Sequence, residues 1–526
     1  MSSFNFNRKE MLRQTFFVSL FFALPLFFYF YYTNFADNDS FFYIREAWRL
    51  RAEGIFNTSF PWTYFSSIKD YGVSLWWGFF VILMPFTFFN DLGAGIKIAG
   101  TVFAFLALLI FYLAVKKEKM AWSFLWPVFY IFSAPNILYR FLMVRPQIIS
   151  TALSFLLLVV LDKQIFWAVG LISFFITWIH FNFFWVPFVI FFFYFFVKIF
   201  LERKADFFGG ICVLGGVLAG WILRPDFIEA AKLVYIQIVK HTLTQSAGIP
   251  LLFGDENQPL LWVTLFRNFL PVLVVFIFCA LVLARFYFEK YKNRKERRAA
   301  EGEIFLLSSF LLASVFFILT MFSARRAYDF WVGFTVLFAA AVMTHAIPKI
   351  SYGLKSFLDN FFKFGILSVF IIAVIYSINR NDISMKEKAF NISEFKEASS
   401  WLKKNSQEGD IVFNLNWSNF SQLFYWNQKN YYVGGLDPIF QYVYNPSLYW
   451  KFHYLSLDEV TKKTCGKEEC RADELEDTYE VLKDDFKARY VFLEKAQNPA
   501  VFWYLGQDSR FEKKFENKTE AVFEVK

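Results

Sequence analysis

The sequence predicts a polytopic α-helical membrane domain followed by a small extracytoplasmic α/β domain. Of its 526 residues, 57% are hydrophobic and only 19% are charged, whereas soluble proteins carry about 25% charged residues. The shortage of charge is concentrated in the first 380 residues, and the composition becomes polar after them. These observations predict a membrane domain at residues 1–380 and a water-soluble domain at residues 381–526.

The first apolar run covers residues 15–32 and follows three basic residues, Arg8, Lys9 and Arg13. A secretory signal peptide has the same order of basic and apolar parts. This run is longer than a typical signal core, and no small-residue cleavage site follows it. We therefore expect a permanent first span that runs from the cytoplasm to the outside, in a plasma or inner membrane.

Further apolar runs continue through the membrane domain, several of them close to the lower limit of the roughly 20 residues that a span needs. Together with the first run they predict about eleven spans. They lie at residues 94–115, 120–135, 147–161, 165–180, 184–201, 206–223, 263–286, 303–321, 328–347 and 361–378.

Basic residues gather in the loops between these runs, above all at residues 116–119 and 285–298. Such loops lie on the cytoplasmic side of a membrane, which explains the net charge of +9 without a nucleic-acid partner. Residues 74–89 conflict with this rule, because as a span they place the 116–119 loop outside. We expect them to lie in the outer interface, with the N-terminus cytoplasmic and the C-terminal domain extracytoplasmic.

The C-terminal domain is predicted to alternate helices and strands. Its apolar spacing indicates an amphipathic helix at residues 390–405. A second helical segment is expected at residues 439–455. Short apolar stretches rich in β-branched and aromatic residues predict strands at residues 410–414, 489–493, 511–515 and 521–525.

Four cysteines are present, two of them in the C-terminal domain. Cys465 and Cys470 flank the sequence GKEE and are expected to form a disulfide if this domain faces an oxidising compartment. The alternative is a pair of free thiols. Cys212 and Cys279 lie in apolar runs and are interpreted as inert core residues.

An acidic motif follows the first span, in the outer loop at residues 34–93. Asp37 and Asp39 stand two residues apart, just before a mixed helix that begins near Ser40. Carboxylates at a helix start interact favourably with its dipole, which is a structural explanation of the pair. The functional explanation is a general base or a cation ligand at the boundary between water and lipid.

This pattern resembles the glycosyltransferases of the GT-C fold, in particular the catalytic subunit of oligosaccharyltransferase and its bacterial relatives. Asp39-Ser-Phe-Phe-Tyr-Ile-Arg45 is similar to the family's first-loop motif. The resemblance implies transfer of a sugar from a polyprenyl-phosphate or polyprenyl-diphosphate donor to a glycan, lipid or protein acceptor on the outer membrane face. It implies that Asp39 is catalytic and able to bind a divalent metal, Mg or Mn, with Asp37 in support.

Arginines at outer span ends are the candidates for binding the donor phosphate. Arg325 and Arg326 begin a late span, and the resemblance places a phosphate-binding arginine at this position. Arg140 and Arg145 lie in a short outer loop, where charges near spans tend to face a cavity or a partner. The guanidinium fork suits phosphate oxygens. The alternative for all four arginines is contact with lipid headgroups.

The sequence departs from the oligosaccharyltransferase pattern in two places. The stretch 416–420 contains Trp417 but no second Trp and no carboxylate, and the outer loop 136–147 is basic where the family has an acidic pair. These departures leave open a non-catalytic envelope or glycan assembly protein. A transporter of lipid-linked glycans is a further alternative, although the charges gather at span ends and no repeat is found. The long outer loop 224–262, which includes Glu256, either covers a substrate groove or is a plain loop.

Overall fold

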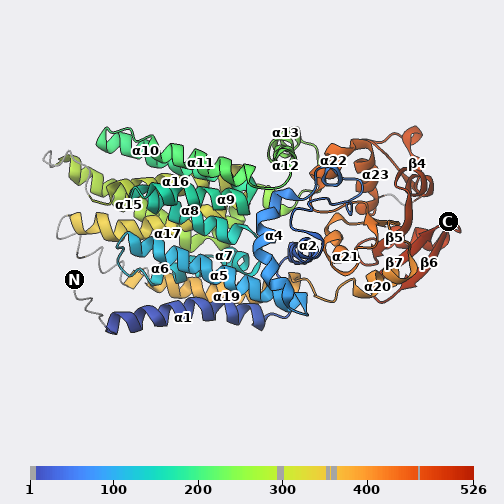
Figure 1. Ribbon diagram of the computed structural model, residues 1–526, viewed down its shortest axis with the longest axis horizontal. Helices are drawn as coiled ribbons and strands as arrows, with labels where there is room; N and C mark the ends of the chain where they lie inside the picture. The colour runs from blue at the N-terminus through green and yellow to red at the C-terminus, as the bar shows by residue number, and fades with distance from the viewer. Residues whose placement is uncertain (1–7, 293–300, 351–355, 357–363, 366, 460–461) are drawn as a thin grey trace. The chain divides into compact units, whose positions relative to one another are not determined.

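The computed structural model describes residues 8–292, 301–350, 356, 364–365, 367–459 and 462–526 (Figure 1). Spatial contacts divide the chain into two units, each assembled from three separate stretches. The helical unit consists of Met1–Asp37, Gly93–Leu223 and Asp255–Ala389. The mixed unit consists of Asn38–Leu92, Arg224–Gly254 and Phe390–Lys526.

The helical unit is a bundle of apolar helices. Every residue of α17 is buried, as expected for a helix that is apolar on all sides, and α8 and α16 pack against it. The main helices of this unit are α1 (Arg8–Tyr31), α5 (Leu92–Lys117), α6 (Leu125–Phe132), α7 (Pro135–Leu142), α8 (Gln147–Asp162), α9 (Phe166–Ile179), α10 (Val186–Glu202), α11 (Phe208–Ile222), α14 (Trp262–Asn268), α15 (Leu270–Lys292), α16 (Glu303–Phe322), α17 (Tyr328–Ala341) and α19 (Leu367–Lys388).

The apolar helices make the chain an integral membrane protein. Among the described residues, six helices are long and apolar enough to cross a membrane, or up to eight if two bent helix pairs each count as one span. The predicted number of about eleven is not confirmed. Two of the predicted runs form helices that are too short to count as spans: α6 has 8 residues and α9 has 14. The run at 361–378 and the basic loop at 285–298 lie partly outside the described residues.

The stretch predicted at the membrane interface is broken into three helical pieces. These are η1 (Ser74–Trp76), α4 (Trp77–Leu83) and η2 (Met84–Phe88), and they belong to the mixed unit. Together they cover 15 residues, fewer than the roughly 20 that a span needs. Their predicted place in the outer interface stays a prediction.

The mixed unit contains a five-stranded sheet with the order β2-β1-β5-β7-β6. Strands β1 (Ile411–Asn414), β5 (Ala488–Glu494), β6 (Phe511–Glu516) and β7 (Glu520–Val525) confirm the four predicted strands. β1 is parallel to both of its neighbours, whereas β7 is antiparallel to β5 and β6. The second parallel neighbour of β1, the two-residue strand β2 (Tyr431–Tyr432), was not predicted.

Helices of the mixed unit also follow the predicted order. The amphipathic helix forms as α20 (Lys396–Asn405). The segment predicted as one helix at 439–455 is two helices, α22 (Pro438–Tyr444) and α23 (Pro446–Ser456). Asn445 separates them in an extended conformation and caps α23 with its side chain, because a residue before proline avoids the helical region. Cys465 and Cys470 are joined by the predicted disulfide.

The outer segment 38–92 packs against this sheet. The backbone amide of Tyr432 donates to the Trp62 carbonyl at 2.8 Å, and the Tyr64 amide donates to the Tyr432 carbonyl at 2.8 Å. Helix α2 (Asp39–Glu53) lies against α21 (Phe420–Trp426). These contacts cover the edge strand β2, which is otherwise a row of unpaired backbone groups. The structure therefore groups this segment with the C-terminal part, while the predicted domain boundary after residue 380 stays a prediction.

Candidate functional site

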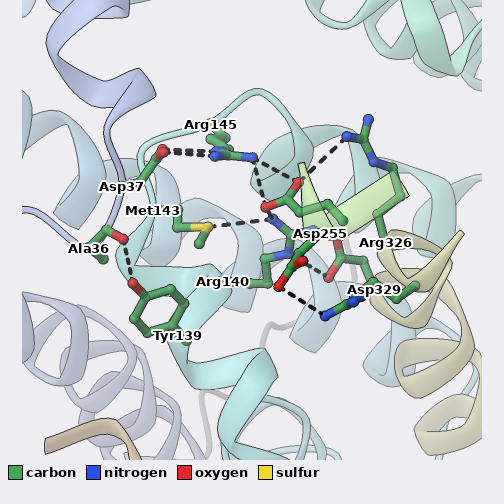
Figure 2. Close-up of polar contacts among 11 residues, drawn as sticks. Ala36, Asp37, Tyr139, Arg140, Met143, Arg145, Asp255, Arg326 and Asp329 are labelled. Carbon is green, nitrogen blue, oxygen red and sulfur yellow. Dashed lines mark hydrogen bonds and ion pairs between the residues drawn. The ribbon is translucent and has the colours of Figure 1, made fainter. Parts of the chain in front are cut away.

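A group of charged side chains lies within the helical unit where several helices begin or end (Figure 2). We call it the arginine cluster. It brings together the four arginines predicted from the sequence and four carboxylates contributed by three separate parts of the chain. Its members are Arg140, Arg145, Arg325, Arg326, Asp37, Asp255, Glu256 and Asp329.

Arg145 joins two carboxylates. Its Nε and Nη2 donate to the two oxygens of Asp37 at 2.8 and 2.7 Å, and its Nη1 donates to both oxygens of Glu256 at 3.0 and 2.9 Å. The arginine occupies the turn between α7 and α8, which meet at an angle of 117°. Pro146 follows it and disfavours a helical conformation at Arg145. The turn thus holds the guanidinium between the two acids, as Figure 2 shows for Asp37.

Arg140 lies at the end of α7 and is 7% exposed. Its Nη1 donates to Glu256 Oε1 at 2.7 Å, and its Nε lies 3.4 Å from Asp329 Oδ1. The guanidinium carbon also lies 5.5 Å from the centre of the Tyr328 ring. A small cavity lies beside Arg140 and Asp329. The centre of a water molecule can occupy about 20 Å³ of it, so the cavity has room for a single water.

Glu256 is the common partner of three arginines. Arg140, Arg145 and Arg326 all contact its carboxylate, the last at 3.6 Å. Burial opposes the charged form of this acid, but the attraction of the three guanidinium groups is stronger and lowers the pKa of Glu256 well below its ordinary value. Its loop is held in place by the amide of Arg325, which donates to the Gln258 carbonyl at 2.7 Å.

Arg325 and Arg326 form η6 (Arg325–Ala327), directly before α17. The Nη1 of Arg325 lies 3.6 Å from Asp255 Oδ2, and the Asp255 side chain is 90% exposed. An exposed ion pair of this kind contributes little to stability. These two arginines are therefore held less firmly than Arg140 and Arg145.

Several N–H groups of the cluster have no hydrogen-bond partner. Among the described residues, Arg140 Nη2, Arg325 Nε and Arg326 Nε are buried and make no hydrogen bond. A buried donor without a partner costs free energy. Three of the four arginines thus retain donor capacity that an anion bound at the cluster can use.

The two predicted catalytic aspartates fall in different units. Asp37 belongs to the helical unit, where it is 2% exposed and bound by Arg145. Asp39 is the first residue of α2 and belongs to the mixed unit. The helix has Asn38 at its N-cap position, without a capping bond from its side chain. Asp39 therefore adds negative charge to the positive end of the helix dipole.

The donor set does not fit a tightly held divalent cation. Both oxygens of Asp37 accept hydrogen bonds from Arg145, whereas Mg²⁺ and Mn²⁺ need several free oxygen ligands. The described part of the chain contains no group of three or more His, Cys, Asp or Glu side chains suited to a metal. The predicted metal-binding role of Asp39 stays a prediction.

Three members of the cluster, Asp255, Glu256 and Asp329, were not predicted as site residues from the sequence. Glu256 was left undecided within the loop 224–262, since nothing in the sequence pairs that loop with residues 140–145. Asp329 was missed, although a carboxylate inside an apolar run next to two arginines is a usable signal, because charges within spans are rare and functional. Glu256 and Asp329 lie far in sequence from Arg140, and only the fold brings them to it.

The fold of the chain is the GT-C fold. No protein-family model and no curated protein matches the sequence. Solved structures of this fold do match it over most of its length. The likeness shows a shared fold and no more, because the identities are low.

Two of the matching structures are transferases from microorganisms. The oligosaccharyltransferase of Archaeoglobus fulgidus in its apo form matches with a TM-score of 0.56 and 12% identity, over 93% of this chain and 70% of that one. ArnT from Cupriavidus metallidurans in its apo state matches with a TM-score of 0.53 and 10% identity, over 97% of this chain and 98% of that one.

Proposed function

We propose that this protein is a membrane glycosyltransferase that transfers a sugar from a polyprenyl-phosphate or polyprenyl-diphosphate donor to a glycan, lipid or protein acceptor. The reaction takes place at the outer membrane face, with the N-terminus in the cytoplasm and the mixed unit outside. The GT-C fold supports a lipid-linked donor, because such a donor can keep its polyprenyl tail in the bilayer while its sugar reaches water.

One observation carries the proposal: Arg140, Arg145, Arg325 and Arg326 converge, and three of them keep buried donors without hydrogen bonds in the described structure. Guanidinium groups match phosphate oxygens in geometry and charge. A donor phosphate at the cluster satisfies these N–H groups.

The transfer step needs an acceptor oxygen, a base and a leaving group. In the proposed step the acceptor oxygen forms a bond to the anomeric carbon of the sugar from the face opposite the phosphate, which inverts this centre. The acceptor proton passes to the carboxylate of Asp39. The bond between the anomeric carbon and the phosphate oxygen breaks, and the polyprenyl phosphate leaves with the electron pair. The arginines stabilise the charge that develops on it.

Thermal stabilisation by lipid-linked sugars tests donor binding. A ligand that binds the folded state raises apparent stability by mass action. We expect one member of a panel of polyprenyl-phosphate sugars to raise the Tm of the purified full chain, and R325A/R326A to reduce this shift by more than half. R285A is the matched control, because Arg285 lies in the same unit with a 44% exposed side chain, outside the cluster. A well-folded sample that no donor stabilises contradicts the proposal.

A second function is favoured by one feature of the cluster. Glu256 already engages three arginines, so the network also suits a non-catalytic assembly protein in which the ion pairs only hold loops together. The variant D39N separates the two functions. An enzyme loses transfer of a radiolabelled sugar while its Tm is unchanged, whereas an assembly protein shows no transfer in either form and supports envelope assembly in both.

A further inference from the structure

A second charged site lies in the helical unit, away from the arginine cluster. It is a large cavity, in which the centres of water molecules can occupy about 870 Å³. Five lysines and a histidine line it, against two glutamates. The lining consists of Leu113, Lys116, Lys117, Glu118, Lys119, Lys163, Glu301, Gly302, Thr344, His345 and Lys349. We call it the lysine cavity.

Two helices connect the arginine cluster with the lysine cavity. Helix α8 begins directly after Arg145 and Pro146, and Lys163 follows its last residue. At about 1.5 Å per residue, its 16 residues span about 24 Å. The helical stretch that starts at Arg325 likewise leads to His345 and Lys349. The two charged sites thus lie at opposite ends of α8, and its length is comparable with the thickness of the hydrocarbon core of a bilayer, about 30 Å.

Most of the positive charge in the lysine cavity is uncompensated. Lys163 pairs with the buried Glu118 at 2.7 Å. Among the described residues, Lys116, Lys117, Lys119 and Lys349 form no ion pair with a carboxylate, and all four are exposed. A concave site lined by charges of one sign concentrates counter-ions. Ammonium groups are well suited to phosphate.

A second, apolar cavity is lined by sequence neighbours of the residues that line the lysine cavity. It has no polar lining surface and is bounded by Trp122, Leu125, Trp126, Phe129, Met343, Leu367 and Phe370. Met343 lines the apolar cavity and Thr344 the lysine cavity. The amide of Ala121, the residue before Trp122, donates to Thr344 Oγ1 at 3.1 Å and joins the two lining segments. Tryptophan is enriched where lipid tails meet the polar interface.

We propose that the lysine cavity binds the headgroup of an anionic membrane phospholipid, with an acyl chain of that lipid in the apolar cavity. The pairing of a positive cavity with an apolar one selects a ligand that carries both an anionic phosphate and a hydrocarbon chain. Basic pockets between membrane helices bind anionic headgroups in this way. The site is independent of the proposed transfer reaction, because it lies at the other end of α8 from the arginine cluster and shares no residue with it.

Binding is measured on the purified full chain by native mass spectrometry and by the shift in Tm. The probes are phosphatidylglycerol, phosphatidylcholine with the same acyl chains, and inorganic phosphate. We expect phosphatidylglycerol to be retained at least tenfold more strongly than phosphatidylcholine. The variant K117Q/K119Q/K349Q should lose this preference. The matched control R203Q/K204Q/R285Q removes the same number of exposed charges from the helical unit and should keep it.

A substitution in the apolar cavity tests the acyl chain separately. Leu367 is 47% exposed, so L367N should leave the fold intact and weaken retention of phosphatidylglycerol. Equal retention by the K117Q/K119Q/K349Q variant and the wild type overturns the proposal. Stabilisation by inorganic phosphate that equals the effect of phosphatidylglycerol overturns the lipid as occupant. The donor-induced Tm shift at the arginine cluster should be unchanged in all these variants, which separates this test from that of the proposed function.

Discussion

The pair Arg145–Asp37 should be strongly coupled in stability. Two short hydrogen bonds of 2.7 and 2.8 Å join the groups, and their side chains are only 15% and 1% exposed. Removing one partner of a buried pair costs about 3–5 kcal/mol, because the other charge loses its compensation. We therefore expect R145M to lower the free energy of unfolding by this amount. The variant D37N/R145M should lose less than the sum of the two single variants.

The measurement is a double-mutant cycle, followed by unfolding in mixed micelles with tryptophan fluorescence. Residues in one ion-pair network show interaction energies of about 0.5–3 kcal/mol, and we expect this pair in the upper part of that range. Lys386–Asp382 is the matched control, an ion pair on the surface of α19 in the same unit. It should show no resolvable coupling. A coupling for Arg145–Asp37 that equals the control refutes the reasoning.

Three further predictions concern pH and metal ions. The pKa of the Glu256 carboxyl is lowered in the folded state. Its ionised form therefore stabilises the fold above the unfolded pKa of about 4.3, and this stabilisation is lost as the pH falls below that value. The Tm of E256Q should therefore fall less steeply on acidification than the Tm of the wild type. Burial, with added repulsion from Glu394 and Glu520, raises the pKa of Glu494 to about 7. The folded state is therefore destabilised as the pH rises from about 4.3 to about 7 and Glu494 ionises. E494Q should raise the Tm at pH 8 and leave it unchanged at pH 4, and an equal shift at both pH values contradicts this assignment. Donor-induced stabilisation should persist in EDTA, since the arginines carry the positive charge; its loss, with recovery on addition of Mn²⁺, points instead to the cation predicted at Asp39.

Local sequence patterns were sufficient for most of the elements. All but the last residue of the run at 15–32 lies within helix α1, and the stretch at 489–493 lies within strand β5. Hydrophobic periodicity and residue type predict such elements because they act over neighbouring residues. The arginines were identified for a similar reason, since a charge next to an apolar run is conspicuous. The number of membrane spans was harder to predict from the sequence. Helix α9 is apolar throughout but has only 14 residues, because its length depends on where the chain turns.

The sequence by itself determined that the chain enters a membrane, carries a polar α/β part at its C-terminal end and places four arginines at helix ends. Only the tertiary structure decided what those arginines contact. Glu256 and Asp329 lie more than a hundred residues from Arg140 along the chain, yet both contact it. The pairing of Trp62 and Tyr64 with Tyr432 is equally remote in sequence. Such contacts depend on how helices and strands pack over long separations, and local composition does not encode them.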